Sequence, residues 1–160
     1  MAINPDIESI KGFRAMLFED VPAVISIEES VYKHPWTEGI FCDCIRVGYN
    51  CFVYEESDVI QAYGLISIAA DEAHILNICV APELQGKGLG KRMLYKLLDT
   101  AEQKAVESVF LEVRVSNQVA IQLYEQEGFN QIGVRKDYYP ADDGKEDALV
   151  FARALNLPDD

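Results

Sequence analysis

The sequence has few basic residues and no long apolar run. Lysine and arginine together number 14 against 27 acidic residues, which gives a formal net charge of −13. Proteins that bind nucleic acid usually carry a basic surface, so this balance argues against such a partner. No apolar run approaches the roughly 20 residues of a membrane-spanning helix, and the N-terminus lacks the pattern of a signal peptide. The sequence therefore predicts a cytoplasmic protein that binds neither nucleic acid nor membrane.

Histidine and cysteine are also scarce, with two histidines and four cysteines, Cys42, Cys44, Cys51 and Cys79. Cys42 and Cys44 form a C-x-C pair instead of the C-x-x-C of zinc sites, and no pair of histidines completes a ligand set. Disulfide frameworks are typical of small secreted domains, not of a cytosolic chain of this length. We therefore expect no metal site and small, mostly buried thiols.

The acidic excess has two interpretations. An acidic surface keeps a cytosolic protein soluble. It also attracts a basic macromolecular substrate over a long range. Charge alone favours the first interpretation, and a basic partner needs support from elsewhere in the sequence.

Hydrophobic periodicity predicts one α/β domain over residues 1–160. Strands are expected at 12–18, 51–54, 59–69, 73–80, 108–115, 129–135 and 148–154, and helices at 21–32, from 37 onward, at 88–104 and at 117–126. Asp20 and Thr37 are the expected N-caps of the first two helices. This order predicts a mixed sheet with three consecutive antiparallel strands, followed by a right-handed parallel crossover over 73–115.

A glycine-rich loop, Gln85-Gly86-Lys87-Gly88-Leu89-Gly90-Lys91, joins a predicted strand to a predicted helix. Glycines let backbone N–H groups approach a ligand, and the free N–H groups at a helix N-terminus favour an anion. The loop departs from the P-loop pattern at two positions and lacks the third glycine of the dinucleotide fingerprint. An anion site and an ordinary turn beside a basic helix face both remain open from the loop alone.

The loop and several later segments resemble the GNAT N-acetyltransferase family. Gln85, Gly88 and Gly90 fit the family's acyl-CoA-binding pattern [QR]-x-x-G-x-[GA], and the expected element order matches the whole fold. Segments at 76–82, 111–117, 120–125, 128–129 and 135–140 resemble the branch of bacterial ribosomal-protein-alanine N-acetyltransferases. The resemblance implies a single-domain, mostly antiparallel α/β fold with a central parallel crossover and helices on both faces. It also implies acetyl-CoA as cosubstrate and no metal.

The resemblance further implies how the coenzyme is held. Backbone groups of Ile78, Cys79 and Val80 take the pantetheine arm as an added strand would, and one of their N–H groups could stabilise the oxyanion. The loop residues Gln85, Gly86, Lys87, Gly88, Leu89, Gly90 and Lys91 hold the pyrophosphate. Asn117 contacts the coenzyme, and its alternative role is that of a helix cap. Cys79 is not the expected nucleophile, because the family transfers the acetyl group directly.

Two catalytic side chains are implied by the same resemblance. Glu112 is the general base, and its alternative is a structural ion pair with Arg114, which strand alternation places on the same face. Tyr124 is the general acid that protonates the departing thiolate, and its alternative is packing against Ile121 and Leu123.

The acceptor side is implied by Arg135, Tyr138 and Tyr139, which resemble the segment that lines the family's substrate channel. An exposed hairpin rim is the alternative. The resemblance implies acetylation of a protein N-terminal amine, an alanine of a small-subunit ribosomal protein. Such a protein is a basic partner for this acidic chain. Lysine, another N-terminus and a polyamine remain alternative acceptors, and a non-catalytic acyl-CoA sensor is the alternative from another class.

Overall fold

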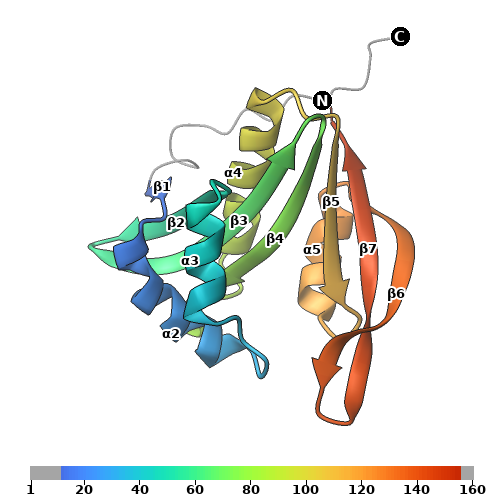
Figure 1. Ribbon diagram of the computed structural model, residues 1–160, viewed down its shortest axis with the longest axis horizontal. Coiled ribbons are helices and arrows are strands. Elements are labelled where there is room, and N and C mark those ends of the chain that lie inside the picture. Colours follow the sequence, from blue (N-terminus) through green and yellow to red (C-terminus); the bar gives the residue numbers. More distant parts are fainter. Residues whose placement is uncertain (1–11, 156–160) are drawn as a thin grey trace.

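The computed structural model describes residues 12–155, which form one seven-stranded sheet with helices on both faces (Figure 1). The strands are β1 (Phe13–Ala15), β2 (Asn50–Glu56), β3 (Val59–Ala69), β4 (Glu72–Val80), β5 (Ser108–Arg114), β6 (Asn130–Ala141) and β7 (Gly144–Ala154). The helices are α2 (Val21–Val31), α3 (Glu38–Arg46), α4 (Leu89–Gln103) and α5 (Gln118–Gln126), with short 3-10 turns η1 (Phe18–Asp20) and η2 (Pro82–Leu84). The strand order is β1-β2-β3-β4-β5-β7-β6, and β4–β5 is the parallel pair of an otherwise antiparallel sheet. The predicted fold class is confirmed.

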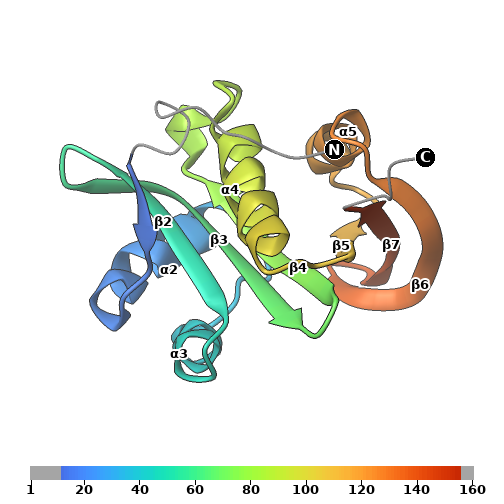
Figure 2. The ribbon, with the colours of Figure 1, turned by 90° about the horizontal axis from the view of Figure 1, so that it is seen from above.

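Helices cover both faces of the sheet (Figure 2), and each face carries its own apolar core. On one face α4 and α5 pack over β4, β5 and β7, and on the other face α2 and α3 cover β2 and β3. Because neighbouring residues of a strand point to opposite faces, Leu65 joins one core and Ile66 the other. Glycine at 64 allows α4 to approach, since an added Cβ would stand only 2.8 Å from Cγ of Met93.

The central parallel pair separates halfway along its length. β4 and β5 pair from Glu72↔Ser108 to Ile75↔Leu111, and the described pairing ends there. At this point β4 has one extra residue relative to β3, because Ile66 faces Ile75 while Leu65 faces Asn77. Such a bulge bends the strand that carries it. As a result β4 diverges from β5 along the rest of its length, as Figure 1 shows.

Several sequence predictions of the first segment need correction. The expected strand at 12–18 ends at Ala15 and passes into η1. Asp20 precedes α2, but its carboxylate does not cap that helix. It accepts hydrogen bonds from the Leu17 N–H at 2.7 Å and from the Arg14 guanidinium at 2.7 and 2.9 Å. The expected cap at Thr37 is confirmed, since its hydroxyl accepts from the Ile40 N–H.

The predicted last two strands are too short. The expected ranges 129–135 and 148–154 become β6 and β7, which extend to the hairpin tip at 142–143. The sequence pattern did not indicate this extension, because Pro140 and the charged residues near the tip are not typical of strands. β6 is an edge strand, where a proline is tolerated because one side of the strand needs no ladder N–H.

The remaining expectations concern cysteines and membranes. All four cysteines are free, and Cys44, Cys51 and Cys79 are buried, as predicted. None of the helices in residues 12–155 has the length and apolar character needed to cross a membrane.

Candidate active site

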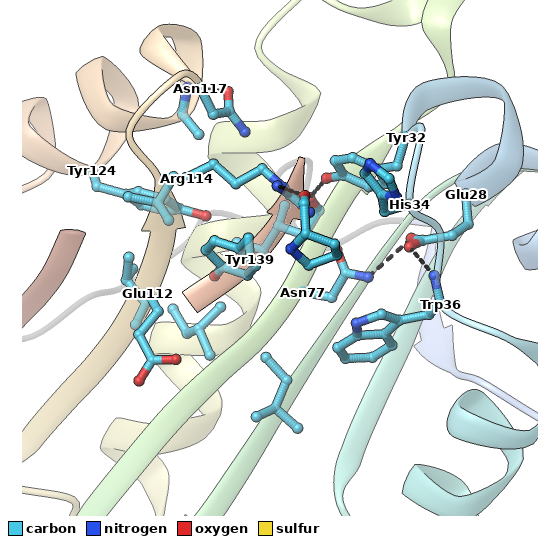
Figure 3. A pocket seen from close by; sticks show the side chains of 17 residues that line it. Glu28, Tyr32, His34, Trp36, Asn77, Glu112, Arg114, Asn117, Tyr124 and Tyr139 are labelled. Atoms are coloured by element: carbon cyan, nitrogen blue, oxygen red, sulfur yellow. Dashed lines mark hydrogen bonds between the residues drawn. The ribbon is translucent and has the colours of Figure 1, made fainter. Parts of the chain in front are cut away.

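A cleft of about 320 Å³ lies where β4 and β5 separate (Figure 3). Its walls are supplied by α2 and the segment that follows it, by β4 and β5, and by α5 and β6. The labelled side chains are Glu28, Tyr32, His34, Trp36, Asn77, Glu112, Arg114, Asn117, Tyr124 and Tyr139. The strand bulge thus creates a cavity at which segments far apart in the sequence meet.

Glu112 lies on the β5 wall of this cleft. The strand alternates as predicted, with Val113 buried and the Glu112 side chain 16% exposed. Its Oε1 lies 3.0 Å from Nε of Arg135, and interaction with this carboxylate raises the pKa of the Tyr138 phenol. The alternative pair with Arg114 is not formed, because that guanidinium binds a different carboxylate, described next.

Arg114 binds groups at the rim of the cleft and does not pair with the candidate base Glu112. One guanidinium nitrogen lies 2.8 Å from Oε1 of Glu146 and 2.8 Å from the carbonyl oxygen of Pro140, to which it donates. The guanidinium also covers the Tyr139 ring at 4.5 Å from its centroid. These contacts attach the β6–β7 hairpin to β5 and place Tyr139 in the cleft wall.

Tyr124 stands on α5, on the same side of the cleft as Glu112 (Figure 3). Its ring belongs to the core and packs against Phe129 at 5.7 Å between centroids, so the packing interpretation holds for the ring. The hydroxyl points into the cleft. Burial raises the pKa of Tyr124, followed in effect by the nearby Tyr139. The phenol is therefore protonated at neutral pH, which is the form that a general acid requires.

The glycine-rich loop lies at the N-terminus of α4. Gly86 and Gly88 have φ angles of +80° and +83°, a left-handed conformation that side-chain-bearing residues rarely adopt. An added Cβ at either position would meet no atom within 4 Å, so the space in front of the loop is open. At Gly90 the Cβ would instead stand 3.8 Å from the Val80 side chain and 3.9 Å from that of Leu123. Gly90 thus faces the gap between the end of β4 and α5.

Most of the basic side chains beside the loop already have partners. Nζ of Lys91 lies 3.4 Å from Oε1 of Glu127. The Arg92 guanidinium covers the Tyr54 ring at 4.9 Å. The Leu89 side chain is buried in the core, so only its backbone can reach a ligand. Backbone N–H groups of the loop are therefore better placed for an anion than the helix lysines are.

The strand residues predicted to meet the coenzyme, Ile78, Cys79 and Val80, lie beyond the described pairing of β4 with β5. The carbonyl oxygen of Ile78 accepts a hydrogen bond of 3.4 Å from the Tyr32 hydroxyl, and that of Val80 accepts one of 3.1 Å from the Gln85 amide. Burial raises the pKa of the Cys79 thiol to about 11. A thiol that is protonated at neutral pH is a poor nucleophile, which supports the exclusion of Cys79 from covalent catalysis.

The helix-cap role considered for Asn117 is confirmed. Its side-chain oxygen accepts from the Ala120 N–H at 3.2 Å and so caps α5. The residue also lines the cleft. A cap on α5 fixes the start of the helix that carries Tyr124.

Of the three predicted acceptor residues, one lines the cleft and two contact the candidate base. Tyr139 is part of the cleft wall. Arg135 and Tyr138 contact Glu112 from outside, with the Arg135 side chain 56% exposed and Tyr138 48% exposed. Tyr139 therefore belongs to the wall of the cleft, whereas Arg135 and Tyr138 form a pair that holds the carboxylate of Glu112.

A buried glutamate at the cleft was missed in the sequence. Glu28 on α2 is 2% exposed and accepts hydrogen bonds from the Tyr63 hydroxyl at 2.6 Å, the Trp36 N–H at 2.9 Å and the Asn77 amide at 3.0 Å. These bonds hold the segment after α2 against β3 and β4. Glu28 follows Val24 by four positions and so lies on the apolar face of the helix. A carboxylate on such a face was the signal in the sequence that could have identified it.

Within residues 12–155, no group of three His, Cys, Asp or Glu side chains is arranged to hold a metal ion. The cleft offers a carboxylate and a protonated phenol, whereas the glycine loop lies outside its lining, at the N-terminus of α4. Residues 13–129 match the acetyltransferase (GNAT) family.

This chain belongs to the GNAT acetyltransferase family.

Relatives within the GNAT family match this chain over most of its length. The [ribosomal protein bS18]-alanine N-acetyltransferase of Escherichia coli (strain K12) is 38% identical over 138 residues, covering 86% of this chain and 93% of the relative. The protein of the same description from Haemophilus influenzae is 35% identical over 134 residues, covering 83% of this chain and 91% of the relative. This chain is accordingly an N-acetyltransferase.

Solved structures agree with the GNAT assignment. The crystal structure of the ribosomal-protein-S18-alanine N-acetyltransferase from Escherichia coli has a TM-score of 0.86 at 35% identity, covering 92% of this chain and 96% of that one. Ard1 from Thermoplasma volcanium shares the fold, with a TM-score of 0.82 at 23% identity over 91% and 97% of the two chains. So does the PaiA N-acetyltransferase of Thermoplasma acidophilum in complex with coenzyme A, with a TM-score of 0.73 at 15% identity over 89% and 98%.

Proposed function

We propose that this GNAT enzyme transfers the acetyl group of acetyl-CoA to the α-amine of an N-terminal alanine on a small-subunit ribosomal protein. The observation that carries the proposal is the cleft between β4 and β5, which both Glu112 and Tyr124 line. The chain matches ribosomal-protein-alanine N-acetyltransferases over most of its length, and this match supports an N-terminal alanine as the acceptor.

The donor fits the separated strands and the glycine loop. Beyond Ile75 the edge of β4 has no described partner on β5, so Ile78, Cys79 and Val80 can pair with the amide groups of an extended pantetheine arm. The left-handed glycines at 86 and 88 keep the loop open, and its N–H groups, including those of Leu89 and Gly90, donate hydrogen bonds to the pyrophosphate oxygens. In this assignment Lys87 is the basic side chain that meets the phosphates. Gln85 and Lys91 have supporting roles at the two ends of the loop.

Glu112 acts as the general base in this proposal. An α-amine has a reference pKa near 8, so its deprotonation at neutral pH costs only about 1 kcal/mol. A carboxylate can accept that proton directly or through one water molecule. Arg135 and Tyr138 hold the carboxylate in place on the outer side of β5.

Tyr124 acts as the general acid. The amine attacks the thioester carbonyl, the C–S bond breaks, and the phenol donates its proton to the departing thiolate. The raised pKa of Tyr124 keeps the proton on the phenol until the thiolate forms. A backbone N–H of Ile78, Cys79 or Val80 stabilises the oxyanion until the C–S bond breaks.

The acceptor enters along the other end of the cleft, between Tyr139 on β6 and the segment that contains His34 and Trp36. Aromatic walls with polar tips suit an extended peptide. The net charge of −13 attracts a basic ribosomal protein. We place this reaction in the cytoplasm, without nucleic acid, membrane or metal as a partner.

A peptide panel tests the proposal. Purified enzyme is incubated with acetyl-CoA and three acceptors: a peptide with a free N-terminal Ala, the same peptide with a blocked N-terminus and an internal Lys, and spermidine. We expect acetylation of the first acceptor alone, measured by mass spectrometry. Turnover of spermidine, or of the blocked peptide alone, contradicts the proposed acceptor, and coenzyme binding without turnover of any amine contradicts catalysis.

A further inference from the structure

A wide bulge interrupts the β6–β7 hairpin beside the candidate base. Arg135 pairs with Ala148 and Tyr139 pairs with Glu146, so three residues of β6 face the single residue Asp147 of β7. A bulge of this kind redirects side chains and is common next to active sites. The three residues are 136–138, and the last of them is Tyr138.

The bulge contains a strained residue that is held by a side chain. Asp137 has a φ of +52°, in the left-handed region that residues other than glycine seldom occupy. Its N–H donates a hydrogen bond of 2.9 Å to Oδ1 of Asp147. A conformation of this kind costs about 1 kcal/mol or more, so it persists only where neighbouring contacts maintain it. The Asp147 carboxylate supplies such a contact.

The residues at the two ends of the bulge converge on one carboxylate. Before the bulge, Arg135 places its Nε 3.0 Å from Oε1 of Glu112. At its end is Tyr138, whose pKa is raised chiefly by the interaction of its hydroxyl with the same carboxylate. The Arg135 guanidinium also covers the Tyr138 ring at 5.6 Å. In a regular strand Arg135 and Tyr138 would point to opposite faces, since they are three positions apart.

We propose that Asp147 is a positioning residue that acts through the Asp137 N–H, maintains the bulge, and thereby holds Arg135 and Tyr138 together on Glu112. The inference rests on the proposed role of Glu112 as general base. Without the bond from Asp147, the bulge relaxes, Tyr138 leaves the carboxylate, and the base loses its fixed orientation. Small misplacements of catalytic groups lower rates by up to about 100-fold.

The test compares three substitutions in the hairpin. Asp147→Asn keeps an oxygen that accepts from the Asp137 N–H. Because that hydrogen bond is retained, we expect kcat/KM for the N-terminal-Ala peptide to stay within about twofold of that of the original enzyme. Asp147→Ala removes the acceptor, and we expect a loss of roughly 10- to 100-fold in kcat/KM with unchanged affinity for acetyl-CoA. Asp143→Ala, which removes the same charge at the hairpin tip, is the matched control and should retain activity.

Titration of Tyr138, followed by NMR of its ring carbon, reports on the contact without any substrate. In Asp147→Ala the pKa of Tyr138 should fall, because the bond to Glu112 that raises it is lost while Arg135, which lowers it, remains nearby. This readout separates the inference from the proposed function: if no peptide is acetylated, the titration still decides whether Asp147 maintains the contact.

Two variants of Asp137 keep the inference testable if Asp147→Ala does not fold. Asp137→Gly tolerates a positive φ and should retain activity, whereas Asp137→Val disfavours it and should reproduce the loss. The inference is overturned if Asp147→Ala keeps both the activity and the Tyr138 titration, if Asp147→Asn and Asp147→Ala are equally impaired, or if both Asp137 variants behave alike.

Discussion

Replacement of Tyr124 by phenylalanine isolates the proton that the proposed mechanism requires. The ring packs against Phe129 and lies in the core, and phenylalanine preserves that packing. Within the described residues the Tyr124 hydroxyl forms no hydrogen bond with another side chain or backbone group, and it points into the cleft. The substitution therefore removes a proton donor from the cleft and leaves the core intact.

The expected effects on stability and on turnover differ widely. Since no internal hydrogen bond is lost, the change in unfolding free energy should be below the roughly 1 kcal/mol that one such bond contributes. For a chain of this length that corresponds to a shift in Tm of less than about 4 °C. Loss of a general acid lowers kcat by about 10²–10⁴-fold, which equals about 3–5 kcal/mol of transition-state stabilisation.

The assay measures kcat by thiol release, the affinity for acetyl-CoA by calorimetry and the Tm by scanning fluorimetry. Tyr49→Phe is the matched control, because Tyr49 is an exposed tyrosine outside the cleft. We expect Tyr124→Phe to lose turnover while acetyl-CoA affinity and Tm change little. If its kcat equals that of the original enzyme, Tyr124 has only a packing role and the proton must come from another group.

Three further predictions follow from other parts of the molecule. Acetyl-CoA should raise the Tm of the original enzyme but not of Gly88→Val, because a β-branched side chain at φ +83° distorts the loop; Gly48→Ala, also at a positive φ but outside the loop, should keep the effect. Asp20→Asn should lower the Tm by a few degrees at pH 7, about 1 kcal/mol for a partly exposed pair with Arg14. The pKa of Asp20 is lowered by Arg14, so its contribution is present above the unfolded pKa of about 4 and is lost as the pH falls below it; an undiminished difference near pH 2.5 would contradict this. Finally, salt should raise KM for a basic peptide more than for a neutral one, and equal salt dependence would remove the role given to the acidic surface.

Local patterns in the sequence predicted most of the fold. The period of α4 and the alternation of β5 are strong signals, and both elements appear within a residue or two of the expected range. The tip of the β6–β7 hairpin was missed because its charged residues form no apolar pattern. That residues 1–160 form a single domain stays a prediction, since its first 11 and last five residues lie outside the described range 12–155.

The site could be predicted only where one residue type is distinctive. The glycines of the loop and the lone carboxylate Glu112 within an apolar strand were visible in the sequence. The contacts of Arg135 and Tyr138 with that carboxylate depend on the bulge at 136–138, and the register of a long hairpin is a tertiary property. The same holds for Glu28, whose partners come from β3, β4 and the segment between α2 and α3.

The acceptor amine can be tested most directly with a single peptide that contains both competing amines. Such a peptide carries a free N-terminal Ala and an internal Lys and is incubated with the enzyme and limiting acetyl-CoA at neutral pH. The lysine ε-amine costs roughly 3 kcal/mol more to deprotonate than the α-amine, by the difference in their reference pKa values. We predict that fragment mass spectrometry finds the acetyl group on the α-amine alone. An acetyl group found chiefly on the lysine would contradict the proposed function, even though the family and the fold would stand.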